Sequence, residues 1–186
     1  IIGLVFFVGV GWFALKREIP KGFGWRLAAL FVLGGLQGAV GWLMVMSGLE
    51  GRTEGSPYRL SAHLLFALFL FSALIWTALD LRRLSRDANA RPARLTGWGA
   101  FALAALFVQL MLGAWVAGLD ACLSYKSWPL MDGSVVPGGL FLQEPWWINL
   151  FENPKTVQFV HRLGAYVLFT LVVIHLISSL RAAPET

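Results

Sequence analysis

The 186-residue sequence predicts an all-α, polytopic membrane helix bundle with about five transmembrane helices. Hydrophobic residues make up 58% of the chain and charged residues 13%, and the mean hydropathy is +0.69. The apolar residues come in runs close to the roughly twenty residues that a membrane-spanning helix needs. The basic residues behind the formal charge of +5 lie in the short segments between these runs, where membrane topology places them. This pattern excludes a soluble domain and a nucleic-acid-binding protein.

The apolar runs define the expected helices in order. Residues 1–15 are apolar, but as a helix they reach only about 22 Å, short of the roughly 30 Å hydrocarbon core. We expect them to be the end of a truncated helix and the chain to be a fragment of a longer protein. Four fuller spans follow, at residues 27–46, 60–79, 97–119 and 157–180. The single cysteine, Cys122, excludes an internal disulfide and is interpreted as a small filler residue.

Charges between the spans predict the orientation of the helices. The first and third connections are basic, which predicts that they face the cytoplasm. Their basic residues are Lys16, Arg17, Lys21, Arg26, Arg82, Arg83, Arg86, Arg91 and Arg94. The second connection is balanced and the fourth is acidic, so both are expected outside. The charged residues of the second are Glu50, Arg52, Glu54 and Arg59. Trp128, Trp146 and Trp147 of the fourth connection fit the aromatic belt at the headgroup level.

Two histidines follow the outer connections. His63 and His161 each lie a few residues into a returning span, which predicts a position near the outer face of the membrane. A histidine inside a membrane helix is by default a functional residue. His175 follows His161 by fourteen positions, about 21 Å deeper along the helix, and we interpret it as a core or lipid-facing residue.

A short sequence repeat precedes each of these histidines. Gln37 precedes Gly41 by four positions, and Gln109 precedes Gly113 by four, and each pair is followed by an outer connection and a helix that opens with a histidine. The repeating unit is a hairpin with one histidine, and two such hairpins are expected to be related by an axis along the membrane normal. The glycines at 34, 38 and 41 are expected to allow close helix packing.

One histidine per hairpin favours ligation of haem iron. Neutral imidazole is a common axial ligand, and a helix bundle can supply such ligands from facing helices. The competing interpretation is a buried histidine that a backbone carbonyl or a neighbouring glutamine satisfies, with no metal. Arg59 and Arg162 could pair with haem propionates or act as plain interfacial anchors, and the sequence leaves both open.

A series of ordered motifs then resembles a known family. They are Leu33–Trp42, Pro57–His63, Gly118–Ala121, Trp128–Gly133, Pro145–Trp147, Asn149–Asn153 and Val157–Arg162. Together they look like haem A synthase of the type found in mitochondria and related bacteria, and the resemblance covers almost the whole chain. Cys122 departs from the small residue expected after Asp120 and Ala121.

The resemblance implies an eight-helix protein made of two similar four-helix halves. Residues 1–94 would be the C-terminal part of the first half, which binds the substrate haem. Residues 95–186 would be the first hairpin of the second half, which holds the cofactor haem, with a long outer loop at 118–156. His63 would then ligate the substrate haem and His161 the cofactor haem. The partner ligands and a catalytic carboxylate loop are expected outside this chain, so no catalytic residue is assigned.

The implied activity is oxidation of a methyl group of haem O to the formyl group of haem A, for cytochrome oxidase assembly. The implied cofactor is haem b, and His161, Arg162 and Arg59 are its candidate binding residues. The implied partners are the substrate haem O, an unidentified electron donor, membrane lipid, a haem O synthase and further copies of the protein, with no nucleic acid. We expect the fragment alone to be inactive, and the outer loop to lie over the His161 site.

Two other functions fit parts of the sequence. A b-type cytochrome that transfers electrons without catalysis would use His161 and His175 for two stacked haems, but it needs a second histidine pair, and only His63 is left. A transporter or assembly scaffold without haem would place charged residues at mid-depth in the spans, where the sequence has only His175.

Overall fold

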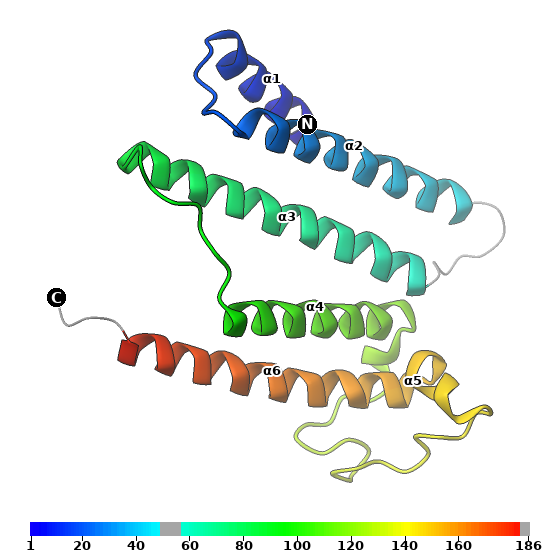
Figure 1. Cartoon of the computed structure of the whole chain (residues 1–186). Helices are drawn as coiled ribbons and strands as arrows, with labels where there is room; N and C mark the ends of the chain where they lie inside the picture. Colours follow the sequence, from blue (N-terminus) through cyan, green and yellow to red (C-terminus); the bar gives the residue numbers. More distant parts are fainter. Residues whose placement is uncertain (49–56, 183–186) are drawn as a thin grey trace. The chain divides into compact units, whose positions relative to one another are not determined.

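The computed structural model describes residues 1–48 and 57–182, and its regular structure is helical (Figure 1). The described residues form four long helices, α2 (Phe23–Gly48), α3 (Pro57–Arg86), α4 (Gly97–Gly118) and α6 (Pro154–Ala182), together with the shorter α1 (Ile2–Leu15). Four of them, all but α1, are long and apolar enough to cross a membrane, which confirms the predicted fold class. Glu50, Arg52 and Glu54 of the predicted second connection lie outside the described residues.

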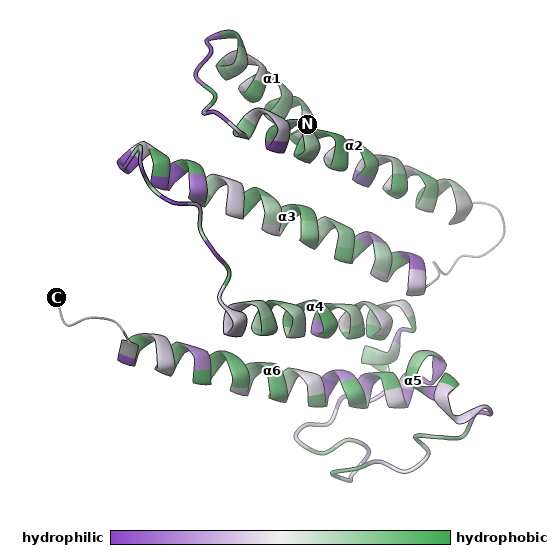
Figure 2. Cartoon of the chain, in the orientation of Figure 1, coloured by the Kyte–Doolittle hydropathy of each residue, from purple (hydrophilic) through white to green (hydrophobic). Residues whose placement is uncertain are grey.

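The helices extend beyond the predicted spans. α3 continues from residue 79 to Arg86, so Arg82, Arg83 and Arg86 are helical rather than part of the connection, and Arg26 lies inside α2. Hydropathy marks only the part of a helix that lies in hydrocarbon. The backbone hydrogen bonds of the helix can continue into water beyond that part. Long arginine side chains can also reach the membrane interface from a position inside the helix. Figure 2 shows this, because α3 is hydrophobic along its middle and hydrophilic towards Arg86.

The described chain forms two compact units. The first unit contains residues 1–48 and 63–94, and the second contains residues 57–62 and 95–182. In the first unit, α1 packs on α2 through Phe6 and Phe7, which stack against Phe31. α2 and α3 are joined by an ion pair of 2.7 Å between Arg26 Nη1 and Asp80 Oδ2. Asp80 is therefore a paired residue near the end of α3 and not an isolated charge at mid-depth.

The second unit is built on the antiparallel pair α4 and α6 (Figure 1). Trp115, Val116 and Val157 are buried between these helices, together with Ala121 of the short helix η1 (Ala121–Leu123). The first turn of α3 belongs to this unit. A Cβ added at Gly118 would lie 2.7 Å from Pro57 Cα, so only glycine allows the turn of α3 to approach the end of α4 this closely.

The long connection between α4 and α6 is ordered by two buried asparagines. It contains η2 (Trp146–Ile148) and α5 (Asn149–Glu152), neither of which the sequence analysis predicts. The fully buried Asn149 accepts a hydrogen bond from Gln143 N at 3.0 Å and donates to the carbonyls of Gln143 and Trp146 at 2.8 and 2.9 Å. Asn153 donates to Asn149 Oδ1 at 3.1 Å, which links the connection to the start of α6.

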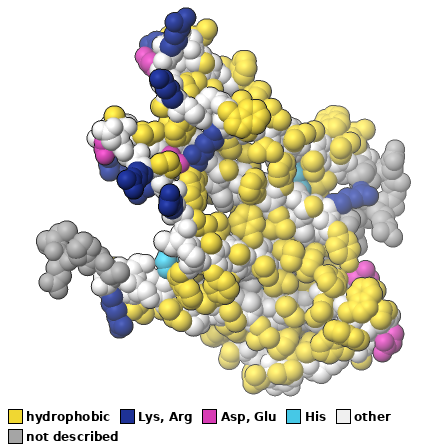
Figure 3. Space-filling view, in the orientation of Figure 1, with side chains coloured by type: hydrophobic (Ala, Val, Ile, Leu, Met, Phe, Trp, Pro, Cys, Tyr) yellow, Lys and Arg dark blue, Asp and Glu magenta, His cyan; other side chains and the backbone are white. Residues whose placement is uncertain are grey.

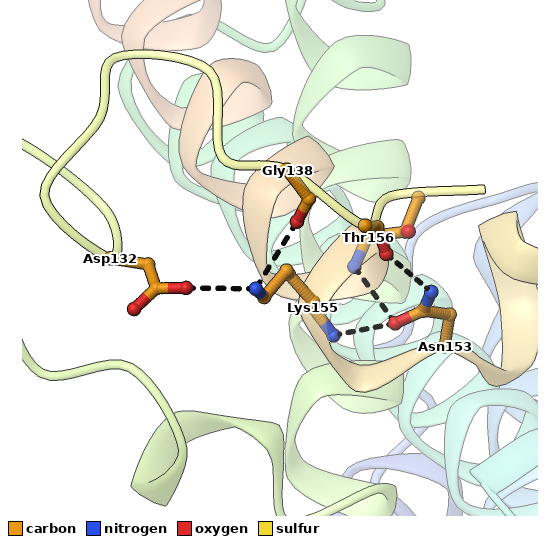
Figure 4. A network of polar contacts seen from close by, with 6 residues as sticks. Asp132, Gly138, Asn153, Lys155 and Thr156 are labelled. Carbon is orange, nitrogen blue, oxygen red and sulfur yellow. Dashed lines mark hydrogen bonds and ion pairs between the residues drawn. The ribbon is translucent and has the colours of Figure 1, made fainter. Parts of the chain in front are cut away.

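The start of α6 completes this polar network (Figure 4). Asn153 Oδ1 accepts from the backbone N–H groups of Lys155 and Thr156, at 3.0 and 3.5 Å, and so caps the helix. Lys155 Nζ donates to Asp132 Oδ2 at 2.9 Å and to the Gly138 carbonyl at 3.2 Å. The Thr156 hydroxyl donates to the Leu140 carbonyl. The outer connection is therefore fastened to the first turn of α6 at several points.

Replacing Asn149 by Asp should loosen this connection. The substitution keeps the shape but puts an acceptor oxygen against the carbonyls of Gln143 and Trp146. We expect a loss of about 1–3 kcal/mol in stability, because a buried polar group loses its partners. Thermal unfolding in detergent and protease cleavage between α4 and α6 measure the effect. Asn89→Asp, at an exposed turn, is the matched control, and equal behaviour of the two variants would contradict the network's role.

Candidate functional site

His63 and His161 occupy matching positions at the beginning of their helices. His63 lies six residues after Pro57 of α3, and His161 lies seven residues after Pro154 of α6. At 1.5 Å per residue, the two imidazoles are about 9 and 10 Å along their respective helices. Both side chains are half-buried. Each histidine therefore lies at a similar distance from the start of its helix.

In the first unit, Gln37 and Gly41 of α2 hold His63. Gln37 Nε2 lies 3.0 Å from the His63 backbone carbonyl, to which it donates, and 3.2 Å from each ring nitrogen. Gly41 follows Gln37 by one helical turn, and a Cβ added there would meet His63 Cε1 at 3.1 Å. The missing side chain at Gly41 thus makes room for the imidazole.

The second unit repeats this arrangement with Gln109, Gly113 and His161. Gln109 Nε2 donates to the His161 carbonyl at 3.0 Å and lies 3.0 Å from His161 Nδ1. A Cβ added at Gly113 would meet His161 Cε1 at 3.1 Å, the same distance as in the first unit. We call each set a Gln–Gly–His triad. The short repeat found in the sequence therefore corresponds to a repeated arrangement of glutamine, glycine and histidine in the structure.

The glutamine amides carry a further signal. Gln37 Oε1 and Gln109 Oε1 are both buried and have no hydrogen-bond partner among the described residues. In this orientation Nε2 donates to the histidine carbonyl, and Oε1 stays a buried acceptor. A half-buried imidazole that a neighbouring amide holds in place can offer a ring nitrogen to a metal, so each triad fits an iron ligand.

A large apolar cavity adjoins the first triad. It has a volume of about 920 Å³ and is lined by residues of α1, α2 and α3, of which only Gln37 and His63 carry polar side chains. Small-molecule sites span roughly 300–1,000 Å³, so this cavity has room for a large ligand. An apolar cavity with one imidazole and one amide suits a flat hydrophobic molecule that offers a metal to the imidazole.

The glycines of α2 line this cavity. Gly34, Gly35, Gly38 and Gly41 all contribute to its wall. The expectation that they allow close helix packing is wrong at Gly38, where an added Cβ would have nothing within 4 Å. At Gly34 an added Cβ would meet only the Leu70 side chain, at 3.9 Å. The glycines thus widen the space beside His63 instead of bringing two backbones together.

The outer connection folds back along the part of α6 that carries His161. Arg162 donates from Nη1 to the Ser127 carbonyl at 2.8 Å and from Nη2 to the Tyr125 carbonyl at 2.7 Å. Gln158 Nε2 also donates to the Tyr125 carbonyl, at 3.0 Å, and Trp128 Nε1 donates to the Tyr166 hydroxyl at 2.9 Å. These contacts involve residues of α6 before and after His161 and not the imidazole itself, so the expectation that the loop lies over the His161 site stays a prediction.

The two arginines named in the sequence analysis differ in position. Arg59 is exposed and lies one turn before His63 on α3, so the two residues share a face of the helix. Arg162 follows His161 directly and binds the loop carbonyls, a role that the sequence analysis missed. The only sequence signal for it is an arginine in the third turn of a helix that follows a long polar connection.

His175 and Cys122 lie apart from the triads. The His175 ring packs 6.5 Å from the Trp98 ring, which fits a packing residue on α6. Cys122 is exposed in η1 and does not fill a core position, so the filler interpretation is wrong. Among residues 1–48 and 57–182, no three His, Cys, Asp or Glu side chains gather to hold a metal ion.

The fold and the triads define a multi-span membrane protein in which each helix hairpin holds one half-buried histidine against a glutamine and a glycine. The chain belongs to the cytochrome oxidase assembly protein family (COX15-CtaA), whose match extends over residues 1–186. It is 54% identical over 185 residues to the heme A synthase of Rhizobium meliloti and 53% identical over 186 residues to that of Agrobacterium fabrum. Each comparison covers 100% of this chain and 50% of the relative, so the chain spans about half the length of these relatives. No solved structure matches the chain significantly.

The triad geometry predicts opposite effects for two neighbouring glycines. Gly41→Ala should push the His63 ring from its place, because the new methyl group meets Cε1 at 3.1 Å. Gly38→Ala, one turn earlier, meets nothing and should gain helix propensity. We expect Gly41→Ala to be less stable than Gly38→Ala by about 1–2 kcal/mol in thermal unfolding. A Gly41→Ala variant as stable as the control would rule out the fitted contact.

Proposed function

We propose that this chain is part of a haem A synthase, which oxidises a methyl group of haem O to the formyl group of haem A by successive hydroxylations. The observation that supports this most is the pair of Gln–Gly–His triads in a chain about half identical to heme A synthases. The proposal covers the full-length protein. The division into a substrate half at 1–94 and a cofactor half at 95–186 forms part of it.

The His63 triad is the proposed substrate site. An exchangeable, apolar macrocycle needs a spacious site that it can enter from the bilayer, and the cavity beside His63 is apolar and bordered by exposed helices. His63 would hold the iron of haem O, and Gln37 would fix the orientation of the imidazole. Arg59, on the same face of α3, is a candidate partner for a propionate of the bound haem.

The His161 triad is the proposed cofactor site for haem b. When bound, haem b supplies one-electron redox chemistry. His161 would ligate its iron, Gln109 would hold the ring, and the connection fastened to α6 would cover the site. Arg162 uses two guanidinium N–H groups for loop carbonyls, and the others are available for a propionate.

The remaining assignments extend this proposal. We place His63 and His161 near the periplasmic face of a bacterial inner membrane, because the basic residues gather at the other ends of the helices. A further ligand for each iron would come from residues outside this chain, and His175, which packs against Trp98, is not assigned as one. An electron donor, a haem O synthase and further copies of the protein are the proposed partners.

Histidine variants of the full-length protein test the ligand assignment. His161→Ala should lose haem b, and His63→Ala should keep haem b but lose haem O and haem A. Reduced-minus-oxidised spectra with pigment extraction measure both. Added imidazole should partly restore the spectrum if only the ligand is missing. His175→Ala is the control and should keep both pigments, whereas loss of haem b from it would favour the electron-transfer cytochrome. Full haem b retention in His161→Ala would refute the assignment.

Gln109 should affect haem b binding by holding His161 in position. Gln109→Leu removes the amide beside His161 Nδ1 and should weaken haem b binding by about 10- to 100-fold, as loss of a residue that orients a metal ligand typically does. Titration of the pigment-free protein with haem measures the affinity. Gln37→Leu is the matched variant in the first triad and should leave haem b affinity unchanged. Equal losses in the two variants would indicate a general effect on folding.

A further inference from the structure

A basic pocket lies at the C-terminal end of α3 in the first unit. It has a volume of about 470 Å³ and is lined by Leu79, Arg82, Arg83, Arg86, Ala93 and Arg94. None of these lining residues is acidic. In the described part of the chain, the ion pairs are Arg26–Asp80 and Lys155–Asp132, so none of the four arginines of the pocket is ion-paired. Figure 3 shows lysines and arginines gathered at this end of α3 and at the α1–α2 connection.

Asp80 helps to build the pocket, and its ion-pair partner, Arg26, is not one of the lining residues. Its Oδ2 pairs with Arg26 at 2.7 Å, and its Oδ1 accepts from Ala93 N at 3.1 Å. The second contact holds the segment after α3 against the helix and so brings Arg94 to the pocket. Asp80 is only 4% exposed and is occupied by these partners. The other nearby acid, Asp87, accepts from Asn89 N in its own turn at 2.9 Å.

An exposed apolar stripe leads into the pocket. Phe71, Ile75 and Leu79 follow one another at four-residue spacing on α3 and are 58%, 45% and 52% exposed. At 100° per residue, they share a sector of about 120° with the helical arginines of the pocket. The stripe is about 12 Å long, which is most of one half of the roughly 30 Å hydrocarbon core. The surface therefore changes from apolar to cationic within one turn of the helix.

We propose that this pocket binds the phosphate head group of an anionic phospholipid, whose acyl chain lies along the stripe. Guanidinium groups bind phosphate oxygens bidentately, and basic pockets on the cytoplasmic side of helix bundles suit such head groups. Topology alone explains why arginines gather at this membrane face. It does not require four of them to line one pocket, or the stripe to end there. The site is separate from both triads and does not depend on the haem assignment.

Lipid binding by the full-length protein in detergent tests the proposal. Native mass spectrometry, with phosphatidylglycerol or phosphatidylcholine of the same acyl chains, counts the bound lipid. We expect wild type to bind phosphatidylglycerol in preference. The double variant Arg82→Gln/Arg86→Gln should weaken this binding by roughly 30-fold, on the scale typical for two basic residues at a membrane surface. Wild type that binds both lipids equally would overturn the proposal.

A matched control distinguishes lipid binding in the pocket from attraction of the lipid by the overall charge of the protein. Lys16→Gln/Arg17→Gln removes the same charge from the α1–α2 connection, outside the pocket, and should change the affinity less than twofold. Equal losses in the two double variants would mean that overall charge attracts the lipid and would overturn the site. Glycerol phosphate without acyl chains should compete poorly. If it binds as tightly as the lipid, the ligand is a free phosphate compound and the lipid proposal fails.

A charge-preserving variant tests the pocket in a protein that keeps its fold and membrane topology. Arg82→Lys/Arg86→Lys keeps the positive charge that orients the helices but loses the bidentate guanidinium geometry. It should bind phosphatidylglycerol several-fold more weakly than wild type while eluting as the same monodisperse species. If the glutamine variant cannot be purified, this variant decides the matter. Wild-type affinity in it would exclude a pocket that depends on guanidinium groups.

Discussion

The hydrocarbon core contains no water, so a polar side chain placed there must find its partner within the protein. This constraint governs both hairpins of the chain. Each imidazole is met by a glutamine from the preceding helix, and a glycine one turn further leaves the space in which the ring fits. The amide also holds the backbone carbonyl of the same histidine. The polar contact therefore fixes the register between the two helices of a hairpin as well as the orientation of the ring.

Buried hydrogen bonds likewise order the long connection between α4 and α6. The side chains of Asn149 and Asn153 satisfy several of its backbone carbonyls from inside the fold. Arg162 and Gln158 reach from α6 to the carbonyl of Tyr125. The helix that carries His161 thus also carries the residues that fasten this connection.

Those parts of the fold that membrane crossing alone determines can be predicted from the sequence. A run of apolar residues must cross the membrane, so hydropathy predicts the helices. The repeated spacing of Gln37 and Gly41 predicts a shared role, because it recurs at Gln109 and Gly113. Contacts between distant segments could not be predicted. Arg162 meets Ser127 thirty-five positions away, and the surroundings of Gly38 depend on the distance between helices, which neither composition nor periodicity encodes.

The two triads share a geometry but differ in their surroundings, and the difference bears on their roles. Beside His63 the glycines of α2 open an apolar cavity of about 920 Å³, which favours a ligand that enters and leaves through the bilayer. Beside His161 a fastened connection runs along the helix, and its hydrogen bonds would have to break before a ligand could leave on that side. A duplicated imidazole site can thus serve exchange in one hairpin and retention in the other, and the ligand chemistry itself need not change.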